Sequence, residues 1–334
     1  MRVVELRAFG GPDSFVLTEL PEPEPGPGEV KVDLVAAALN RREWWIRNGP
    51  KIALPAILGS DGAGVVSAVG PRVGVSVGDE VVIYPGIGWG DDEAAAADGF
   101  VLVGVPGQGT YAEQIVVRGE QVRPRPQGWS WLETAALPVA GLTAWRALVT
   151  CAGAGPDKTL LVTGAGGGVA TFAIQIGAAL GARILVTTSS PEKLERARLL
   201  GAEDGADYCD PSWPDRVGPV DAVIDSVGGD VWRGAVAALR PGGVLVTFGD
   251  TGGELASVPI ADFFFRHLRI HGTTLGSPRE FDALLAHCAD ASWRPVIDSV
   301  YPLDEAAKAH ERLDSPDRFG KVVLAINEQR AGDG

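Results

Sequence analysis

The sequence has few of the residues that form disulfides or bind transition metals. Its 334 residues include only Cys151, Cys209 and Cys288, and four histidines that all lie beyond residue 266. Three widely spaced cysteines can build neither a disulfide framework nor a cysteine-rich zinc lobe. We therefore predict a reducing environment and expect the protein to be cytoplasmic.

Long apolar runs and an excess of positive charge are also missing. No uninterrupted stretch approaches the roughly 18 to 20 apolar residues that span a bilayer, and Met1–Arg7 carries charges where a signal peptide needs an apolar core. Basic residues number 29 against 43 acidic residues, which gives a formal net charge of −14. Such a surface repels phosphate backbones and anionic membranes, so we expect no nucleic-acid partner and no membrane partner.

Apolar residues are abundant enough to form large cores. Hydrophobic residues make up 46% of the chain and charged residues 22%, and the length corresponds to about two domains. The first third is rich in turns, and its valine-rich runs at 29–36, 62–69 and 79–84 predict a compact β-barrel-like unit.

From about Trp131 the pattern changes to buried strands alternating with helices. This alternation predicts an α/β unit with a doubly wound parallel sheet. The predicted strands are 160–163, 183–187, 220–225 and 244–248, and the predicted helices are 169–180, 191–200 and 229–239.

A glycine cluster follows the first of these strands. A strand that ends in glycines and leads directly into a helix presents free backbone N–H groups and the positive end of the helix dipole, which together suit a pyrophosphate. The strict G-x-G-x-x-G spacing does not fit, whereas Gly164-x-x-Gly167-x-x-Ala170 fits better. We predict that a dinucleotide binds at this loop, which consists of Gly164, Ala165, Gly166, Gly167, Gly168, Val169 and Ala170.

The end of the next strand bears on the choice between NADH and NADPH. An acidic residue there would bind a ribose 2′-hydroxyl, but residues 186–190 read Val-Thr-Thr-Ser-Ser. Hydroxyl groups and the ammonium of Lys193 suit a 2′-phosphate. Ser190 can equally act as the cap of the next helix, with Pro191 at its first position, and this leaves Ser189 and Lys193 available. We therefore predict NADPH as the cofactor.

With this loop in place, the whole chain resembles the medium-chain dehydrogenase/reductase superfamily, and most of all its zinc-free quinone oxidoreductase branch. The matching segments occur in order along the chain, at 37–40, 58–66, 69–70, 78–81, 137–144, 164–170, 200–202 and 320–324. The resemblance implies a GroES-like catalytic barrel formed by residues 1–124 and 296–334, and a Rossmann domain formed by residues 125–295. It also implies a small-molecule substrate bound in the cleft between them and subunits joined through their Rossmann sheets, so we expect a homodimer.

The resemblance further implies where the cofactor is held. Gly164–Ala170 would bind the pyrophosphate. The 2′-phosphate would be surrounded by Ser189, Lys193 and Tyr208, and the adenosine would be lined by Ser226 and Val227. The nicotinamide half would lie along Phe248, Gly249, Asp250, Thr273, Thr274 and Leu275, with Asn40 and Thr143 beside the ring.

The metal ligands of zinc-dependent relatives are replaced in this chain. Those relatives carry Cys at the position of Asn40 and Gly-His-Glu at 59–61, which here reads Gly-Ser-Asp, and they carry four cysteines in the lobe that corresponds to 86–108. His267 and His271 have the i, i+4 spacing of a helical metal pair, but neither a carboxylate nor a cysteine accompanies them. We therefore predict that no metal is bound.

The loss of the metal ligands limits the chemistry that we expect. Zinc stabilises the alkoxide formed when a simple alcohol or ketone exchanges hydride. A conjugated acceptor instead spreads the charge into an enolate, which hydrogen-bond donors can stabilise, and quinones share this property. We therefore expect reduction of a quinone or an α,β-unsaturated carbonyl compound. The alternatives are an enoyl-thioester reductase, a zinc-free alcohol dehydrogenase, and a non-catalytic NADPH-binding regulatory protein.

Substrate-facing residues are expected in segment 40–47. Asn40 could donate a hydrogen bond, and Trp44 or Trp45 could stack on a flat ligand, although both indoles could instead belong to the barrel core. Asp61 either faces the site or braces the backbone of residues 62–64, and Tyr84, at the start of loop 85–108, could cap the cleft. The catalytic candidates are thus Asn40, Asp61 and Thr143.

Overall fold

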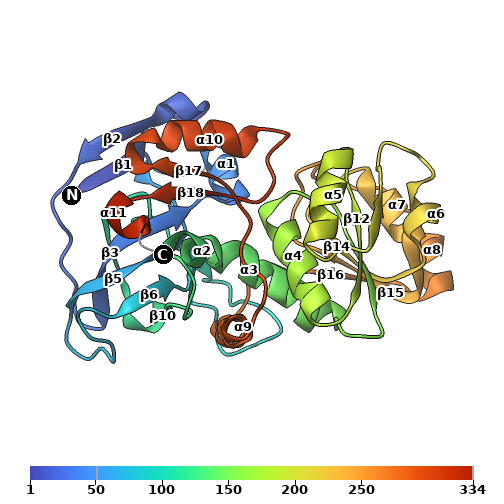
Figure 1. The fold of residues 1–334 in the computed structure, drawn as a ribbon, viewed down its shortest axis with the longest axis horizontal. Helices are drawn as coiled ribbons and strands as arrows, with labels where there is room; N and C mark the ends of the chain where they lie inside the picture. The colour runs from blue at the N-terminus through green and yellow to red at the C-terminus, as the bar shows by residue number, and fades with distance from the viewer. Residues whose placement is uncertain (50–51, 333–334) are drawn as a thin grey trace. The chain divides into compact units, whose positions relative to one another are not determined.

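The structure is a computed structural model that describes residues 1–49 and 52–332 (Figure 1). The chain forms two compact units. The first unit comprises Met1–Ala140 and Ser277–Gly334, and the second comprises Gly141–Gly276.

The first unit is built on a seven-stranded sheet in the order β10-β6-β5-β3-β18-β17, with β9 also paired to β3. The C-terminal strand β18 pairs antiparallel with β3, so that Val323 lies opposite Ala38. The end of the chain therefore completes a sheet begun by the N-terminal third. The strands are β3 (Glu29–Ala38), β5 (Asp61–Val69), β6 (Glu80–Ile83), β9 (Gln114–Arg118), β10 (Val122–Pro124), β17 (Ile297–Pro302) and β18 (Lys321–Ala325).

Smaller elements complete the first unit. A three-stranded sheet in the order β2-β1-β4 and a two-stranded sheet of β7 and β8 accompany the large sheet. These strands are β1 (Arg2–Leu6), β2 (Phe15–Glu19), β4 (Ala56–Ile57), β7 (Gly86–Ile87) and β8 (Val101–Leu102). The helices are α1 (Arg41–Asn48), α2 (Trp131–Ala136), the first residues of α3 (Pro138–Trp145), α9 (Pro278–Ala289), α10 (Ala306–Asp314) and α11 (Glu328–Ala331), with 3-10 turns at 12–14, 119–121 and 303–305.

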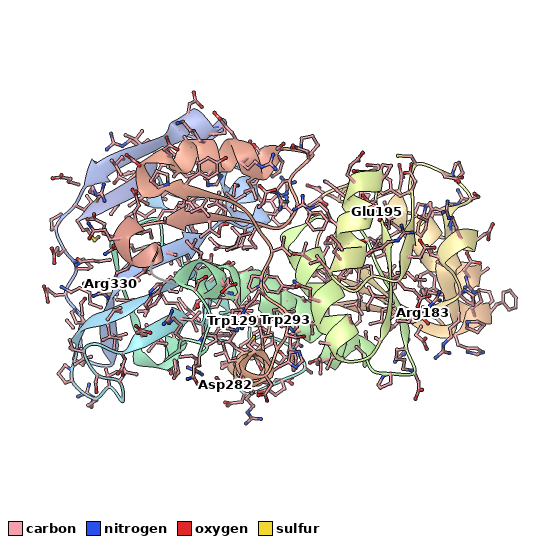
Figure 2. All side chains as sticks on the ribbon, in the orientation of Figure 1. Trp129, Arg183, Glu195, Asp282, Trp293 and Arg330 are labelled. Carbon is pink, nitrogen blue, oxygen red and sulfur yellow. The ribbon has the colours of Figure 1, made fainter. Side chains whose placement is uncertain are left out.

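Helices α2 and α9 both belong to the first unit. Trp131 and Ala135 of α2 pack on Val35 and Val323 of the large sheet. Asp282 of α9 forms an ion pair with Arg123 at 2.5 Å, and the ring centroids of Trp129 and Trp293, the latter just beyond α9, lie 5.5 Å apart in an edge-to-face contact (Figure 2). The domain boundaries expected from the sequence, at 124/125 and 295/296, would place these two helices in the Rossmann domain. Those boundaries stay a prediction.

The second unit is a six-stranded parallel sheet in the order β13-β12-β11-β14-β15-β16 (Figure 1). Its core includes Leu161, Leu185, Val223 and Leu245 from four adjacent strands. The strands are β11 (Thr159–Val162), β12 (Arg183–Thr187), β13 (Asp204–Ala206), β14 (Val220–Asp225), β15 (Leu239–Thr247) and β16 (Arg269–Gly272). The helices are α4 (Gly168–Ala179), α5 (Pro191–Leu199), α6 (Trp213–Val217), α7 (Val231–Ala238) and α8 (Ile260–Arg266), and a π-helix spans Arg146–Ala152 after α3.

The parallel sheet confirms the predicted fold class, and β12 and β14 match their predicted ranges residue for residue. Strand β15 begins at Leu239, five residues before the predicted start at Val244. Pro241 and two glycines lie in this stretch, and Leu239 already pairs with Val220 across a register shift. None of the helices in the described residues combines the length and hydropathy needed to cross a membrane.

Candidate active site

The glycine loop lies at the carboxyl end of β11, between β12 and β14. Gly164 and Gly166 have φ values of +67° and +115°, which residues with a Cβ rarely adopt, and the amide of Ala165 donates to the carbonyl of Thr187 at 2.9 Å. Helix α4 begins at Gly168 without a side-chain cap, so the first-turn N–H groups point toward this loop without an intrahelical acceptor. The loop therefore has the donors and the open backbone that a pyrophosphate requires.

Two of the residues predicted around a 2′-phosphate, Ser189 and Tyr208, are in contact at the end of β12, and Lys193 lies in the first turn of the helix that follows. The hydroxyl of Tyr208 donates to Oγ of Ser189 at 3.0 Å. Ser190 is the N-cap of α5, since its Oγ accepts from the amide of Lys193 at 3.2 Å, which confirms the capping interpretation. Glu192 is the acidic residue of this segment, and its carboxylate accepts from the Ser190 hydroxyl at 2.7 Å.

The loops after β14 and β15 are joined directly to each other. The amide of Gly252 donates to the carbonyl of Val227 at 2.6 Å, and the hydroxyl of Thr251 donates to the carbonyl of Ser226 at 3.1 Å. Predicted contact residues Phe248, Gly249 and Asp250 lie in the second of these loops. Both loops leave the carboxyl ends of parallel strands, the edge at which doubly wound sheets bind ligands.

The remaining nicotinamide-side candidates are found after β16 and on α3. Oγ1 of Thr273 accepts from Nε of Arg146 at 2.9 Å, and Thr274 follows it. Leu275 and Thr143 are both buried, with 2% and 7% of their surface exposed. Thr143 belongs to the second unit, whereas Asn40 belongs to the first.

In the first unit, Asn40, Asp61 and Lys321 form a buried polar group that we call the Asp61 network. Asp61 has no exposed surface, and its Oδ2 accepts from Nδ2 of Asn40 at 2.9 Å and from Nζ of Lys321 at 3.0 Å. Its Oδ1 accepts from the backbone amide of Val139, at the start of α3, at 2.8 Å. Asp61 thus joins β5, the residue before α1, β18 and α3, and its carboxylate is a bracing group rather than a free base.

Lys321 is the member of the Asp61 network that the sequence did not reveal. Its side chain is 2% exposed, and besides Asp61 its ammonium donates to Oδ1 of Asn40 at 2.6 Å and to the carbonyl of Leu39 at 2.8 Å. The sequence feature that could have revealed Lys321 is that it is a single lysine in the apolar run 320–324. Every residue of β18 is buried in the structure. A charged residue within a buried strand needs a partner, and Asp61 is that partner.

Glu43 lies beside the Asp61 network on α1 and has no exposed surface. Burial raises the pKa of Glu43 to about 7. Its Oε1 accepts from Oγ of Ser60 at 3.3 Å, and the same hydroxyl lies within hydrogen-bonding distance of the carbonyl of Val103, at 2.8 Å, and accepts from Arg42 at 3.1 Å. Ser60 therefore connects Glu43 to Val103 and to Arg42.

The aromatic candidates occupy different environments. Trp44 packs against the barrel core and lies under the guanidinium of Arg41, 5.2 Å from the ring centroid. Trp45 is 40% exposed. Tyr84 is buried, with its ring centroid 5.6 Å from that of Phe281, so its ring belongs to the core of the first unit.

The groups at the zinc-ligand positions do not fit a zinc ion. They offer an amide, a hydroxyl and one carboxylate that a lysine and an amide already engage, whereas structural and catalytic zinc is bound mostly by Cys and His. His267 ends α8 with a positive φ, and His271 lies in β16, so the two do not share a helix face. Among the described residues, no group of three His, Cys, Asp or Glu side chains could hold a metal ion. The absence of a metal stays a prediction.

Comparisons with known proteins extend over both units. The family described as "Alcohol dehydrogenase GroES-like domain" matches residues 26–127, and the family described as "Zinc-binding dehydrogenase" matches residues 168–290. A zinc-type alcohol dehydrogenase-like protein of Leptosphaeria maculans is 34% identical, with 93% of this chain and 94% of that protein covered. A quinone oxidoreductase of Pseudomonas aeruginosa is 32% identical, with 96% and 98% covered.

A solved structure agrees with these relatives. The crystal structure of an NAD-dependent alcohol dehydrogenase superposes with a TM-score of 0.91 at 39% identity, with 98% of this chain and all of that chain covered. The glycine loop on a parallel sheet, the barrel sheet completed by the C-terminal strands and the end-to-end similarity lead to one assignment. The chain is an oxidoreductase of the medium-chain dehydrogenase/reductase superfamily and belongs to its quinone oxidoreductase-like branch.

Proposed function

We propose that this protein is an NADPH-dependent, metal-independent reductase of quinones or of α,β-unsaturated carbonyl compounds such as enones and enals. The observation that carries the proposal is the Asp61 network, which holds the amide of Asn40 through two charged partners. A primary amide has two N–H donors, and Asp61 takes one of them. The other N–H is the group that we assign to a substrate oxygen.

The network makes Asn40 a stronger donor than an isolated amide. The ammonium of Lys321 donates to its carbonyl oxygen at 2.6 Å, which polarises the amide and strengthens the hydrogen bonds that its N–H groups donate. Bound NADPH supplies the hydride. Charge that then develops on a conjugated carbonyl oxygen needs a preorganised donor, which Asn40 provides without a metal.

The choice of NADPH rests on the residues at the end of β12. Ser189 and Tyr208 are hydrogen-bonded to each other, and Lys193 lies in the first turn of α5, where a phosphate would also meet the helix N-terminus. The NAD-dependent alcohol dehydrogenase compared above makes NADH the alternative. Substitution of Lys193 by alanine should weaken NADPH binding roughly tenfold or more and NADH binding much less.

The control for this substitution is Lys158→Ala, which removes a partly exposed lysine of the second unit that pairs with Asp221. It should leave the dissociation constants of both cofactors unchanged. Equal losses of NADPH and NADH affinity in Lys193→Ala would contradict the 2′-phosphate assignment.

Oxidation of NADPH with a panel of acceptors tests the reaction. Quinones, enones and enals should be reduced, whereas enoyl thioesters and saturated ketones represent the alternative reductase and the zinc-free alcohol dehydrogenase. The description of the Leptosphaeria maculans relative is the observation that favours the alcohol dehydrogenase alternative. Tight NADPH binding without oxidation across the whole panel would support a regulatory protein instead.

A homodimer is part of the proposal. Strand β16 is an edge of the parallel sheet, and next to it in the chain α8 exposes Ile260, Phe264 and Phe265, by 79%, 58% and 77%. Exposed apolar side chains in such a group mark an interaction surface, and a second copy of the edge strand can continue the sheet.

A cytoplasmic location is proposed on the low cysteine content alone.

Light scattering of the purified protein tests the dimer. Phe265→Glu should shift the molecular mass from dimer to monomer, because it places a charge in the apolar surface. Leu199→Glu, at an 87% exposed position on α5, is the matched control and should leave the mass unchanged. A wild-type monomer at all concentrations would contradict the dimer.

A further inference from the structure

Asp225 is a buried carboxylate in the second unit, outside the Asp61 network. It is the last residue of β14 and has no exposed surface. Burying a charge is costly unless hydrogen bonds compensate it, and here four donors converge on two oxygens. They are Oγ1 of Thr163 at 2.7 Å, Nε1 of Trp232 at 2.8 Å, the amide of Gly228 at 3.1 Å and the amide of Val227 at 3.2 Å.

These donors come from three different segments. Thr163 immediately precedes the glycine loop, Val227 and Gly228 form the loop after β14, and Trp232 lies in the first turn of α7. Strand β11 pairs with β12 on one side and with β14 on the other, and the strand order reverses between β11 and β14. The glycine loop after β11 and the loop after β14 therefore flank this point. Ligands of doubly wound sheets bind at that point.

Val227, whose amide is bound by Asp225, also contacts the glycine loop. A Cβ built on Gly164 would lie 3.0 Å from Cγ2 of Val227, so the two loops are already in close contact. The carbonyl of Val227 also accepts from the amide of Gly252 in the loop after β15. Asp225 therefore determines the separation of the glycine loop and the 226–228 loop, and through Val227 it connects both to the third loop.

We propose that Asp225 is the positioning residue of the dinucleotide site, holding the glycine loop and the 226–228 loop at the spacing that binds the pyrophosphate and adenosine. The proposal rests on the proposed function only in taking the ligand to be a nicotinamide dinucleotide. The pyrophosphate and the adenosine are common to NADH and NADPH, so Asp225 acts equally on the affinity of both cofactors, in contrast to Lys193.

Thr163→Val tests the proposal with little change in shape. It removes one of the four donors and leaves the other three, so the protein should fold. The matched control is Thr134→Val, which removes the hydroxyl of another fully buried threonine, one that donates to the carbonyl of Ser130 in the first unit. Dissociation constants for NADPH and NADH are measured by protein fluorescence, and thermal unfolding is followed without ligand.

Thr163→Val should weaken both dinucleotides by roughly tenfold, the effect of one hydrogen bond to a charged group. Thr134→Val should lower the unfolding temperature about as much as Thr163→Val does, because each removes one buried hydroxyl. It should leave both dissociation constants within about twofold of wild type. Asp225→Asn should weaken binding further, because its NH₂ group would face backbone and indole donors. If that variant does not fold, Trp232→Phe, which loses only the indole donor, takes its place.

The outcomes separate this proposal from the proposed function. Unchanged affinity in Thr163→Val and Trp232→Phe, with wild type binding either cofactor, would overturn the role of Asp225 alone. A wild-type protein that binds neither dinucleotide would overturn both proposals. A loss confined to NADPH would also contradict the positioning role, because the contacts assigned to Asp225 are shared by both cofactors.

Discussion

At the scale of single residues, Asn40 owes its orientation to two charged neighbours from distant parts of the chain. Asp61 accepts from its Nδ2, and Lys321 donates to its Oδ1. This pair of contacts defines which atom is the acceptor and which is the donor, so the amide cannot flip without opposing donors to each other. The second N–H, which we assign to a substrate oxygen, is therefore presented in one direction.

Asn40→Ala should lower kcat for an enone or a quinone by roughly 10² to 10³, the range measured for loss of one oxyanion-hole donor. The Michaelis constant for NADPH should change little. Asn48→Ala is the control, since Asn48 is exposed at the other end of α1 and donates to the carbonyl of Trp44 within the same helix. Equal activity of Asn40→Ala and wild type would contradict the assignment.

Glu43 gives stability a dependence on pH that can be measured. Its pKa is about 7 in the folded protein, and in the unfolded chain the ordinary value of 4.5 applies. Between these values the folded protein holds a proton that the unfolded chain releases, so stability falls as pH rises, by roughly 3 kcal/mol in total. Burial is the largest cause of the raised pKa of Glu43, and the charge of Asp61 adds to it, whereas Arg42, the backbone amide of Asn40 and Lys321 lower this pKa.

Denaturant unfolding between pH 4.5 and 7.5 compares wild type with Glu43→Gln. The variant should lack this decline. His310, whose burial lowers its pKa to about 3, contributes the opposite slope in both proteins, so the difference between the two curves isolates Glu43. Parallel curves would show that Glu43 is ionised throughout.

Several site residues could be predicted from the sequence, and others could not. Asn40 and Asp61 follow from their place in the motif pattern, and the structure brings them within 2.9 Å. Lys321 lies 260 residues from Asp61, and only the pairing of β18 with β3 brings the two together. The orientation of Tyr84 into the core was likewise beyond a local pattern, because its partner Phe281 lies on α9.

At the scale of elements, the strand–loop–helix unit from β11 to α4 depends on backbone conformation. The positive φ of Gly164 lets the chain turn from the strand into the glycine loop, and Val227 lies against it. Local signals of this kind are visible in a sequence, which is why the glycine loop and the cap of α5 were predicted correctly. The start of β15 was wrong because its pairing with β14 continues past proline and glycine residues that locally indicate a turn.

Gly164→Ala should destabilise the protein by roughly 1 to 2 kcal/mol and weaken dinucleotide binding, because a Cβ is strained at this φ and contacts Val227. Gly155→Ala is the control, since its φ is ordinary and a Cβ there meets no atom within 4 Å. Chemical denaturation and cofactor titration measure the two effects. A Gly164→Ala variant with wild-type affinity would show that the backbone turn is dispensable for binding.

At the scale of the whole molecule, the order of elements could be predicted from composition and periodicity. Near Trp131 the sequence pattern changes from short valine-rich runs to strands alternating with helices. This change predicts a barrel-like unit followed by a parallel sheet, and the structure contains both. The unit to which α2 and α9 belong depends on long-range contacts such as that of Trp129 with Trp293. Helical periodicity alone carries no information about such partners.

The central claim is that a conjugated acceptor is reduced without the help of a metal. The most direct measurement is NADPH oxidation by an enone, a quinone and acetone in excess EDTA, together with the metal content of the same preparation. We expect undiminished turnover of the conjugated acceptors, little turnover of acetone and no stoichiometric zinc. Turnover of acetone or ethanol that EDTA abolishes and added zinc restores would contradict it.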